Sequence, residues 1–153
     1  MSNLELRIPP IVLALICLIG MWVTAVLCPA LTLPFHWSNL LAVVFVCCGA
    51  LLPILAAVEF RRAKTTLDPR CPEQSSQLVT RGVFGLSRNP IYLGFVLLLI
   101  GAAWYLMNML AVFWVLAFGL YMTRFQIQPE ERHMEERFSD EFRSYSARVK
   151  RWF

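Results

Sequence analysis

The chain alternates between long stretches without charge and shorter stretches rich in charge. No Asp, Glu, Lys or Arg occurs from residue 8 to 58 or from residue 89 to 123. A bilayer core accommodates roughly 20 apolar residues per helix. The first stretch is therefore long enough for two spans, and the second for a tight hairpin of two shorter ones around Asn108. The pattern predicts an all-α integral membrane protein, a single membrane domain over residues 1–153 with four transmembrane helices at about 8–33, 40–60, 91–105 and 110–126.

The charged stretches predict the topology. All of the 14 Lys and Arg residues except Arg7 lie within 61–88 and 124–151, next to the ends of the predicted spans. Basic loops are retained on the cytoplasmic side, so we expect both termini there, in a bacterial inner membrane. The loop at 61–89 and a helical tail at 128–153 would then face the anionic surface of the lipid bilayer. Nucleic acid is not an expected partner.

The first apolar segment has a competing interpretation as a secretory signal peptide. The opening MSNLELR carries one acid and one base, and no small-x-small site precedes a polar mature sequence. We therefore expect the segment to be retained as a span. The composition, 58% hydrophobic and 16% charged, agrees with this, because soluble domains carry about 25% charged residues.

Neither the cysteines nor the histidines indicate a metal site. Four of the five cysteines lie in predicted spans and none forms C-x-x-C, so we interpret them as small buried hydrophobes. Glu130 and His133 have the spacing of a helix-bundle metal motif, but such sites need several carboxylate helices. We expect no metal.

The sequence GVFGLSRNPIYLG, residues 82–94, places a polar turn directly before an apolar run. Pro90 fixes φ and lacks an N–H, which suits the first position of a helix. The free N–H groups of that first turn can bind an anion or a carboxylate, and glycines allow backbone to approach a ligand closely. The alternative is an ordinary helix start whose Arg88 meets a lipid phosphate.

The tail begins with QIQPEERHMEERF, residues 126–138, and carries one apolar helical stripe. Ser139 followed by Asp140 and Glu141 resembles an N-cap, so we expect a break near 138–139. Glu130 and Glu131 are adjacent, so one should face inward while the other is solvated. Both could simply complement the helix dipole. Carboxylates at the membrane surface would also suit a cationic ligand such as an adenosyl sulfonium.

Three segments together resemble a known group of enzymes: KTTLDP, LVTRGVFGLSRNPIYLG and PEERHMEERFSDEFRSYSARVKRW. They are similar to the isoprenylcysteine carboxyl methyltransferase and phospholipid methyltransferase group of integral membrane enzymes, over roughly residues 64–153. The resemblance implies S-adenosyl-L-methionine as cofactor, bound without a soluble methyltransferase domain. It also implies cofactor contacts at Ser76, Gln77, Leu78, Val79, Phe84, Asn89, Pro90, Ile91, Tyr92 and Glu130.

Three positions depart from the group's pattern. Asn89 stands where a histidine is usual, and Phe84 where a tyrosine is usual. In the prenylcysteine enzymes an arginine one turn before the glutamate orients the substrate carboxylate, and Gln126 occupies that substrate-binding position here. Arg124 or Arg88 would have to replace it.

The chemistry that the resemblance implies is an in-line displacement at a methyl sulfonium. A carboxylate or thiolate acceptor needs no general base, and orientation alone can lower a barrier by up to ~7–11 kcal/mol. A lipophilic small-molecule acceptor would enter sideways from the bilayer, with Arg88 or Arg124 placing its polar head. An amine or hydroxyl acceptor would need a base, for which Glu131 is the candidate. Two alternatives are an NADPH-dependent sterol or steroid reductase and a non-enzymatic membrane adaptor. The sequence selects neither the acceptor nor an oligomeric state.

Overall fold

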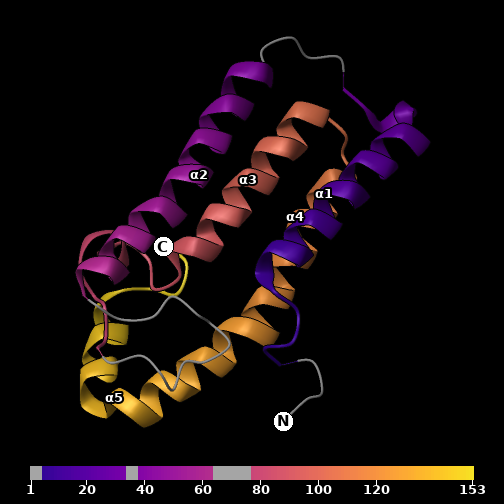
Figure 1. Cartoon of the computed structure of the whole chain (residues 1–153). Coiled ribbons are helices and arrows are strands. Elements are labelled where there is room, and N and C mark those ends of the chain that lie inside the picture. The colour runs from indigo at the N-terminus through magenta and orange to yellow at the C-terminus, as the bar shows by residue number, and fades with distance from the viewer. Residues whose placement is uncertain (1–4, 34–37, 64–76) are drawn as a thin grey trace.

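The computed structural model describes residues 5–33, 38–63 and 77–153, and within these ranges the chain is almost entirely helical (Figure 1). The all-α prediction is confirmed for this part of the chain, where the single extended contact is a bridge between Thr32 and Asn108. The elements in order are α1 Pro10–Leu27, η1 Pro29–Leu31, α2 Ser38–Arg62, η3 Gly82–Gly85, α3 Pro90–Leu106, α4 Ala111–Tyr121, η4 Met122–Ile127 and α5 Gln128–Arg148.

The four apolar helices stand side by side, and α5 turns away across one end of them (Figure 1). Helix α3 is central, because it packs against α2 on one side and against α1 and α4 on the other. Of the described helices, two are long and apolar enough to cross a bilayer, over Pro10–Leu27 and Asn39–Arg62, and Pro90–Leu106 is shorter and apolar. Large apolar side chains such as Ile19, Trp22 and Leu120 are exposed on the outer faces, as expected for contact with lipid. Four crossings remain a prediction.

Helices α2 and α3 pack closely against each other at glycine residues. A Cβ placed on Gly94 would lie 2.7 Å from the carbonyl oxygen of Gly49, and one placed on Gly49 would lie 2.8 Å from the carbonyl oxygen of Gly94. Pro53 lies inside α2 and has no N–H to offer the Gly49 carbonyl four residues before it. That carbonyl faces the Gly94 backbone instead. Gly101 packs against Ala42 in the same way. Small residues at a helix crossing allow such close packing within a membrane.

The end of the first span differs from the predicted one, whereas the end of the third agrees with it to within one residue. Helix α1 ends at Leu27 and not near residue 33, because Pro29 disfavours helical backbone at the residue before it. At the same end of the bundle α3 ends at Leu106, and the next residue, Met107, has a left-handed φ of 49°. The expected hairpin around Asn108 is present. The Asn108 side-chain amide donates to the Cys28 carbonyl and the Thr32 hydroxyl, each at 3.0 Å.

The fourth apolar helix does not end before the tail. Helix α4 continues through the π-helical segment η4 into α5 without an intervening loop. In an α-helix of 3.6 residues per turn, side chains four positions apart differ in direction by about 40° around the helix axis. A π turn contains more residues than an α turn, so it rotates the following side chains back. As a result, four side chains spaced by four residues all point toward α3 or its first turn: Phe118, Met122, Gln126 and Glu130. Within α5 the predicted break near residues 138–139 is confirmed, because Ser139 has φ 36° and ψ −107°.

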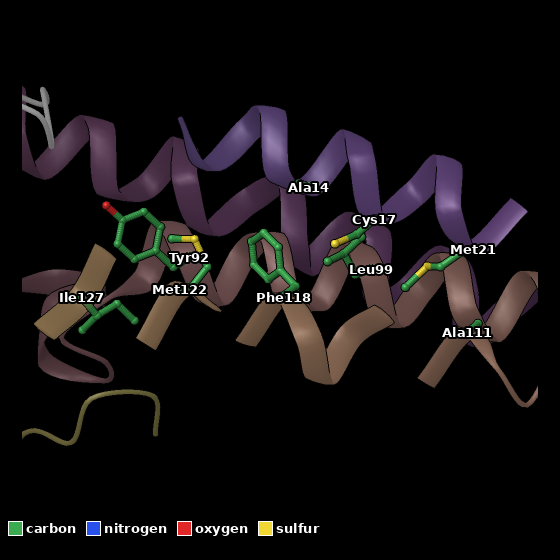
Figure 2. Packing of buried hydrophobic residues seen from close by; sticks show 9 residues of the cluster. All are labelled: Ala14, Cys17, Met21, Tyr92, Leu99, Ala111, Phe118, Met122 and Ile127. Carbon is green, nitrogen blue, oxygen red and sulfur yellow. The ribbon is translucent and has the colours of Figure 1, made fainter. Parts of the chain in front are cut away.

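The main core is a row of buried residues between α1, α3 and α4, continuing into η4 (Figure 2). Tyr92 and Ile127 lie at one end of the row, and Met21 and Ala111 at the other. The hydroxyl of Tyr92 points out of the apolar cluster. The apolar bundle therefore ends, at the α5 side, on a polar group.

Candidate functional site

The polar turn before α3 is shaped by Gly82 and Pro90. Gly82 has φ +60°, and a Cβ there would lie 2.8 Å from the Glu59 carboxylate, so this position requires glycine. Gly82 is the first residue of η3, which buries Val83 and Phe84 against Ala56 of α2. The chain then reaches Pro90, the first residue of α3. The turn is thereby fixed to the α2 side of the bundle.

Tyr92, Gln126 and Glu130 form a hydrogen-bonded cluster between the first turn of α3 and the η4–α5 segment. The Tyr92 hydroxyl donates to Oε1 of Glu130 at 2.5 Å, and Nε2 of Gln126 donates to the same oxygen at 2.7 Å. Gln126 Nε2 also lies 3.4 Å from the Tyr92 hydroxyl. Both bonds to Glu130 end on Oε1. Among the described residues, Oε2 is left to accept a hydrogen bond from a ligand.

The environment of Glu130 favours its neutral form more than water does. Burial, together with the nearby Glu131, raises the pKa of Glu130 from 4.5 to about 7, while the hydrogen bonds from Tyr92 and Gln126 oppose the rise. The carboxyl group therefore takes up a proton more readily than an exposed glutamate does. A cation bound beside it would favour the carboxylate.

Glu131 takes part in a second cluster with two arginines. Arg151 donates to both carboxylate oxygens, at 3.1 Å from Nε and 2.6 Å from Nη2, and Arg88 Nη2 lies 3.0 Å from Oε1. The expectation that one of the two adjacent glutamates is solvated is wrong, because the Glu131 side chain is only 18% exposed. Hydrogen bonding to Glu131 raises the pKa of Arg151, which therefore stays charged.

The end of the chain lies along the polar turn. The Arg151 carbonyl accepts hydrogen bonds from the Asn89 amide at 2.9 Å and from the Ser87 hydroxyl at 3.3 Å. The Lys150 carbonyl accepts the Arg88 backbone N–H at 3.0 Å. Earlier in the tail, the Tyr145 hydroxyl donates to the Phe84 carbonyl at 2.7 Å. The turn and the tail, more than sixty residues apart in sequence, are thus joined at four positions.

The other residues expected to contact the cofactor flank this site. Phe84 is buried and packs edge to face on Phe60, with ring centroids 5.1 Å apart. Val79 packs against the same cluster, and Ile91 contacts both this cluster and the main core. Of the remaining positions, Leu78 is half-buried, Gln77 is exposed and Ser76 lies outside the described residues.

Arg124 is not brought into the site. Its half-exposed guanidinium lies 3.9 Å from Glu5 and 3.3 Å from the Gln128 side-chain oxygen. Residues two positions apart on a helix point to nearly opposite sides, so Gln126 faces Tyr92 while Arg124 faces the N-terminal segment. Of the two arginines proposed to place an acceptor, Arg88 is the one beside Glu131.

Three residues at the site were not singled out from the sequence: Ser87, Tyr145 and Arg151. Tyr145 belongs to the apolar stripe of the tail and Arg151 to its basic end, so each had a simpler explanation. The described residues contain no group of three or more His, Cys, Asp or Glu side chains able to hold a metal ion.

The comparisons with known proteins indicate the family of the chain. The family model described as phospholipid methyltransferase matches residues 37–141, which include both the polar turn and Glu130. A protein of Arabidopsis thaliana, Protein-S-isoprenylcysteine O-methyltransferase B, is 28% identical over 116 residues, covering 74% of this chain and 57% of that protein. A protein of Haemophilus influenzae described as uncharacterized is 40% identical over 62 residues, covering 40% of this chain and 98% of that protein. No solved structure matches.

Proposed function

Since the chain belongs to the phospholipid methyltransferase family, we propose that it transfers a methyl group from S-adenosylmethionine to a lipophilic or isoprenoid-type acceptor at the cytoplasmic face of the membrane. The observation that carries the proposal is the hydrogen bond between Tyr92 and Glu130. It joins the polar turn before α3 to the start of α5, the two segments that the family resemblance assigns to one cofactor.

The residues present fit a cationic nucleoside. Oε2 of Glu130 can accept a hydrogen bond from a ribose hydroxyl, and its carboxylate complements a sulfonium charge. The Asn89 amide donates through Nδ2 to Arg151, which leaves its side-chain oxygen to accept from a ligand. Glu130, Asn89 and the backbone at Ile91 would hold the cofactor, together with residues 77–79.

The cofactor supplies an electrophilic methyl group on sulfur. The protein's contribution is to orient the acceptor in line with that methyl group and to exclude water. Arg88 can place an anionic acceptor group, since its guanidinium lies beside the site and, among the described residues, is paired with a single carboxylate, that of Glu131.

We favour an acceptor that is a carboxylate or a thiolate. Both oxygens of Glu131, the candidate base, are engaged by guanidinium groups. A base must reach the proton that it removes, and this carboxylate would first have to leave its ion pairs. A carboxylate or thiolate needs no such step.

Thermal shift of the purified, detergent-solubilised protein tests the cofactor assignment. A ligand that binds the folded state raises the melting temperature by mass action. We expect S-adenosylmethionine and S-adenosylhomocysteine to raise it. Stabilisation by NADPH alone would support the reductase, and no shift with any of the three would support the adaptor.

Substitutions locate the site in the same assay. Glu130→Ala and Tyr92→Ala should each abolish the shift with S-adenosylhomocysteine, while Glu136→Ala, an exposed position on α5, should keep it. Equal behaviour of all three variants would place the site elsewhere. A radiolabelled methyl transfer assay on membrane extract, followed by lipid separation, identifies the acceptor.

A further inference from the structure

Arg151 contacts both halves of the proposed cofactor site at once. Its guanidinium holds Glu131 through two hydrogen bonds, of 3.1 and 2.6 Å. Its carbonyl oxygen holds the side chains of Asn89, at 2.9 Å, and Ser87, at 3.3 Å. Figure 1 shows the C-terminus beside the first turn of α3. One residue therefore spans the distance between the polar turn and the start of α5.

The guanidinium controls the position of the first turn of α5. Planar, bidentate pairing between arginine and a carboxylate fixes direction as well as distance, and the Glu131 side chain is only 18% exposed. Glu130 is the adjacent residue on the same helical turn, so a rotation that released Glu131 would also move Glu130 away from Tyr92.

The carbonyl controls the orientation of Asn89. An asparagine amide can present either its oxygen or its nitrogen to a ligand. Donation from Nδ2 to the Arg151 carbonyl fixes the nitrogen on the tail side. Donation from the Asn89 backbone N–H to the Ser87 hydroxyl, at 3.1 Å, fixes the turn itself. The Asn89 oxygen is then the atom left for a ligand.

We propose that Arg151 is a positioning residue of the cofactor site, whose side chain aligns Glu130 through Glu131 and whose backbone aligns Asn89. This inference rests on the proposed function. Arg151 lies beyond the residues that the family model matches, and it touches neither cofactor nor acceptor in this role. The C-terminal segment is thereby part of the site and not only a membrane-surface tail.

Binding of S-adenosylhomocysteine, measured by titration calorimetry on the full-length protein, tests the proposal. Arg151→Ala should raise the dissociation constant roughly tenfold, the effect of losing a hydrogen-bonded charge. Arg151→Lys, which keeps the charge and loses the bidentate geometry, should give a smaller rise. Arg148→Ala is the matched control, because Arg148 is exposed and bonds within its own helix, to the Ser144 carbonyl.

The pH dependence separates positioning from a general loss of stability. Glu131 raises the pKa of Glu130, and Arg151 and Arg88 are the cations that, among the described residues, offset the charge of Glu131. In Arg151→Ala the pH midpoint of S-adenosylmethionine binding should therefore move upward, whereas in Arg151→Lys it should stay at the wild-type value. A merely structural residue would lower the melting temperature of both variants and leave the midpoint unchanged.

A double-mutant cycle keeps the test decisive if Arg151→Ala folds poorly. Arg151→Lys combined with Glu131→Gln should weaken binding no more than the stronger single change, because both act through one contact. Additive effects, or wild-type affinity in Arg151→Lys and Arg151→Ala alike, would overturn the inference. Failure of the wild-type protein to bind either ligand would instead overturn the proposed function.

Discussion

The Tyr92 hydroxyl oxygen lies 2.5 Å from Oε1 of Glu130, and this contact joins the first turn of α3 to the first turn of α5. The two residues are 38 positions apart, with the α3–α4 hairpin between them. Because α3 and α4 run antiparallel through the bundle, both segments return to the same end. The contact brings a buried hydroxyl group to the carboxylate that we assign to the cofactor.

Tyr92→Phe removes this donor and keeps the ring in the core. The hydrogen bond lowers the pKa of Glu130, so its loss should raise that pKa above about 7 and leave less carboxylate at neutral pH. We expect the affinity for S-adenosylmethionine at pH 7 to fall roughly tenfold, as for loss of a hydrogen bond to a charged group. Titration calorimetry between pH 6 and 9 should show the binding midpoint shifted upward. Tyr105→Phe, at an exposed position at the far end of α3, should match the wild type.

Glu130→Gln tests the charge itself. Since the pKa of Glu130 is about 7, the group is protonated and neutral below that pH and a carboxylate above it. A sulfonium cation binds the carboxylate better, so wild-type affinity for S-adenosylmethionine should rise as the pH increases from about 6 to 8. By linkage, binding should release a fraction of a proton near pH 7.

A glutamine side chain at this position cannot titrate, so the Glu130→Gln variant should lose this part of the pH dependence and keep any that belongs to the ligand's own groups. The difference between the two pH profiles isolates Glu130. Identical profiles in wild type and variant would contradict the assignment of this carboxylate to the cation.

The hydrophobic pattern was sufficient for much of the fold, because charge is excluded from bilayer-spanning helices whatever their neighbours are. The uncharged stretches predicted the positions of all four apolar helices, and the turn chemistry of Ser139 predicted the break within α5. The ends of the helices were less accurate. Pro29 determines where α1 ends, but the uncharged sequence that follows it, ALTL, reads as a continuation of the span.

The π-helical segment η4 could not be predicted, because it depends on what its side chains meet. Nothing in MTRFQI marks a π turn. The segment places Gln126 and Glu130 where both can form hydrogen bonds with Tyr92 of another helix. The same holds for Glu131, which Arg151 holds from the far end of the tail, whereas the sequence indicated only that one of Glu130 and Glu131 would be solvated. Contacts that bring distant segments together are properties of the packing and leave no local signature.

Gly94→Ala should destabilise the contact between α2 and α3. The added methyl carbon would lie 2.7 Å from the Gly49 carbonyl oxygen and 2.7 Å from Cδ of Pro53, and neither a backbone atom nor a proline ring can move aside easily. Overpacking of this kind costs about 1–3 kcal/mol. Thermal unfolding in detergent should show a lower melting temperature.

Gly119→Ala provides the matched control on α4. Its added methyl group would meet nothing within 4 Å, and alanine favours a helix over glycine by roughly 0.5–1 kcal/mol. The control should therefore be neutral or slightly stabilising. A melting temperature of Gly94→Ala equal to that of Gly119→Ala would mean that the two helices are farther apart than the structure has them.

Glu5→Gln should loosen η4 without touching the cofactor site directly. The Glu5 carboxylate lies 2.7 Å from Arg132 and 3.9 Å from Arg124, and the Leu6 N–H donates to the Phe125 carbonyl inside the π segment at 3.0 Å. Leu6 has a left-handed φ of 57°, a conformation that costs a leucine about 1–2 kcal/mol and needs these contacts to persist. Since an ion pair of this kind contributes up to about 1 kcal/mol, its loss should speed amide hydrogen exchange in residues 122–127 by up to roughly fivefold. Glu135→Gln breaks a more exposed pair with Arg143 and should leave exchange in that segment unchanged. Equal exchange in both variants would show that the N-terminal segment does not hold η4 in place.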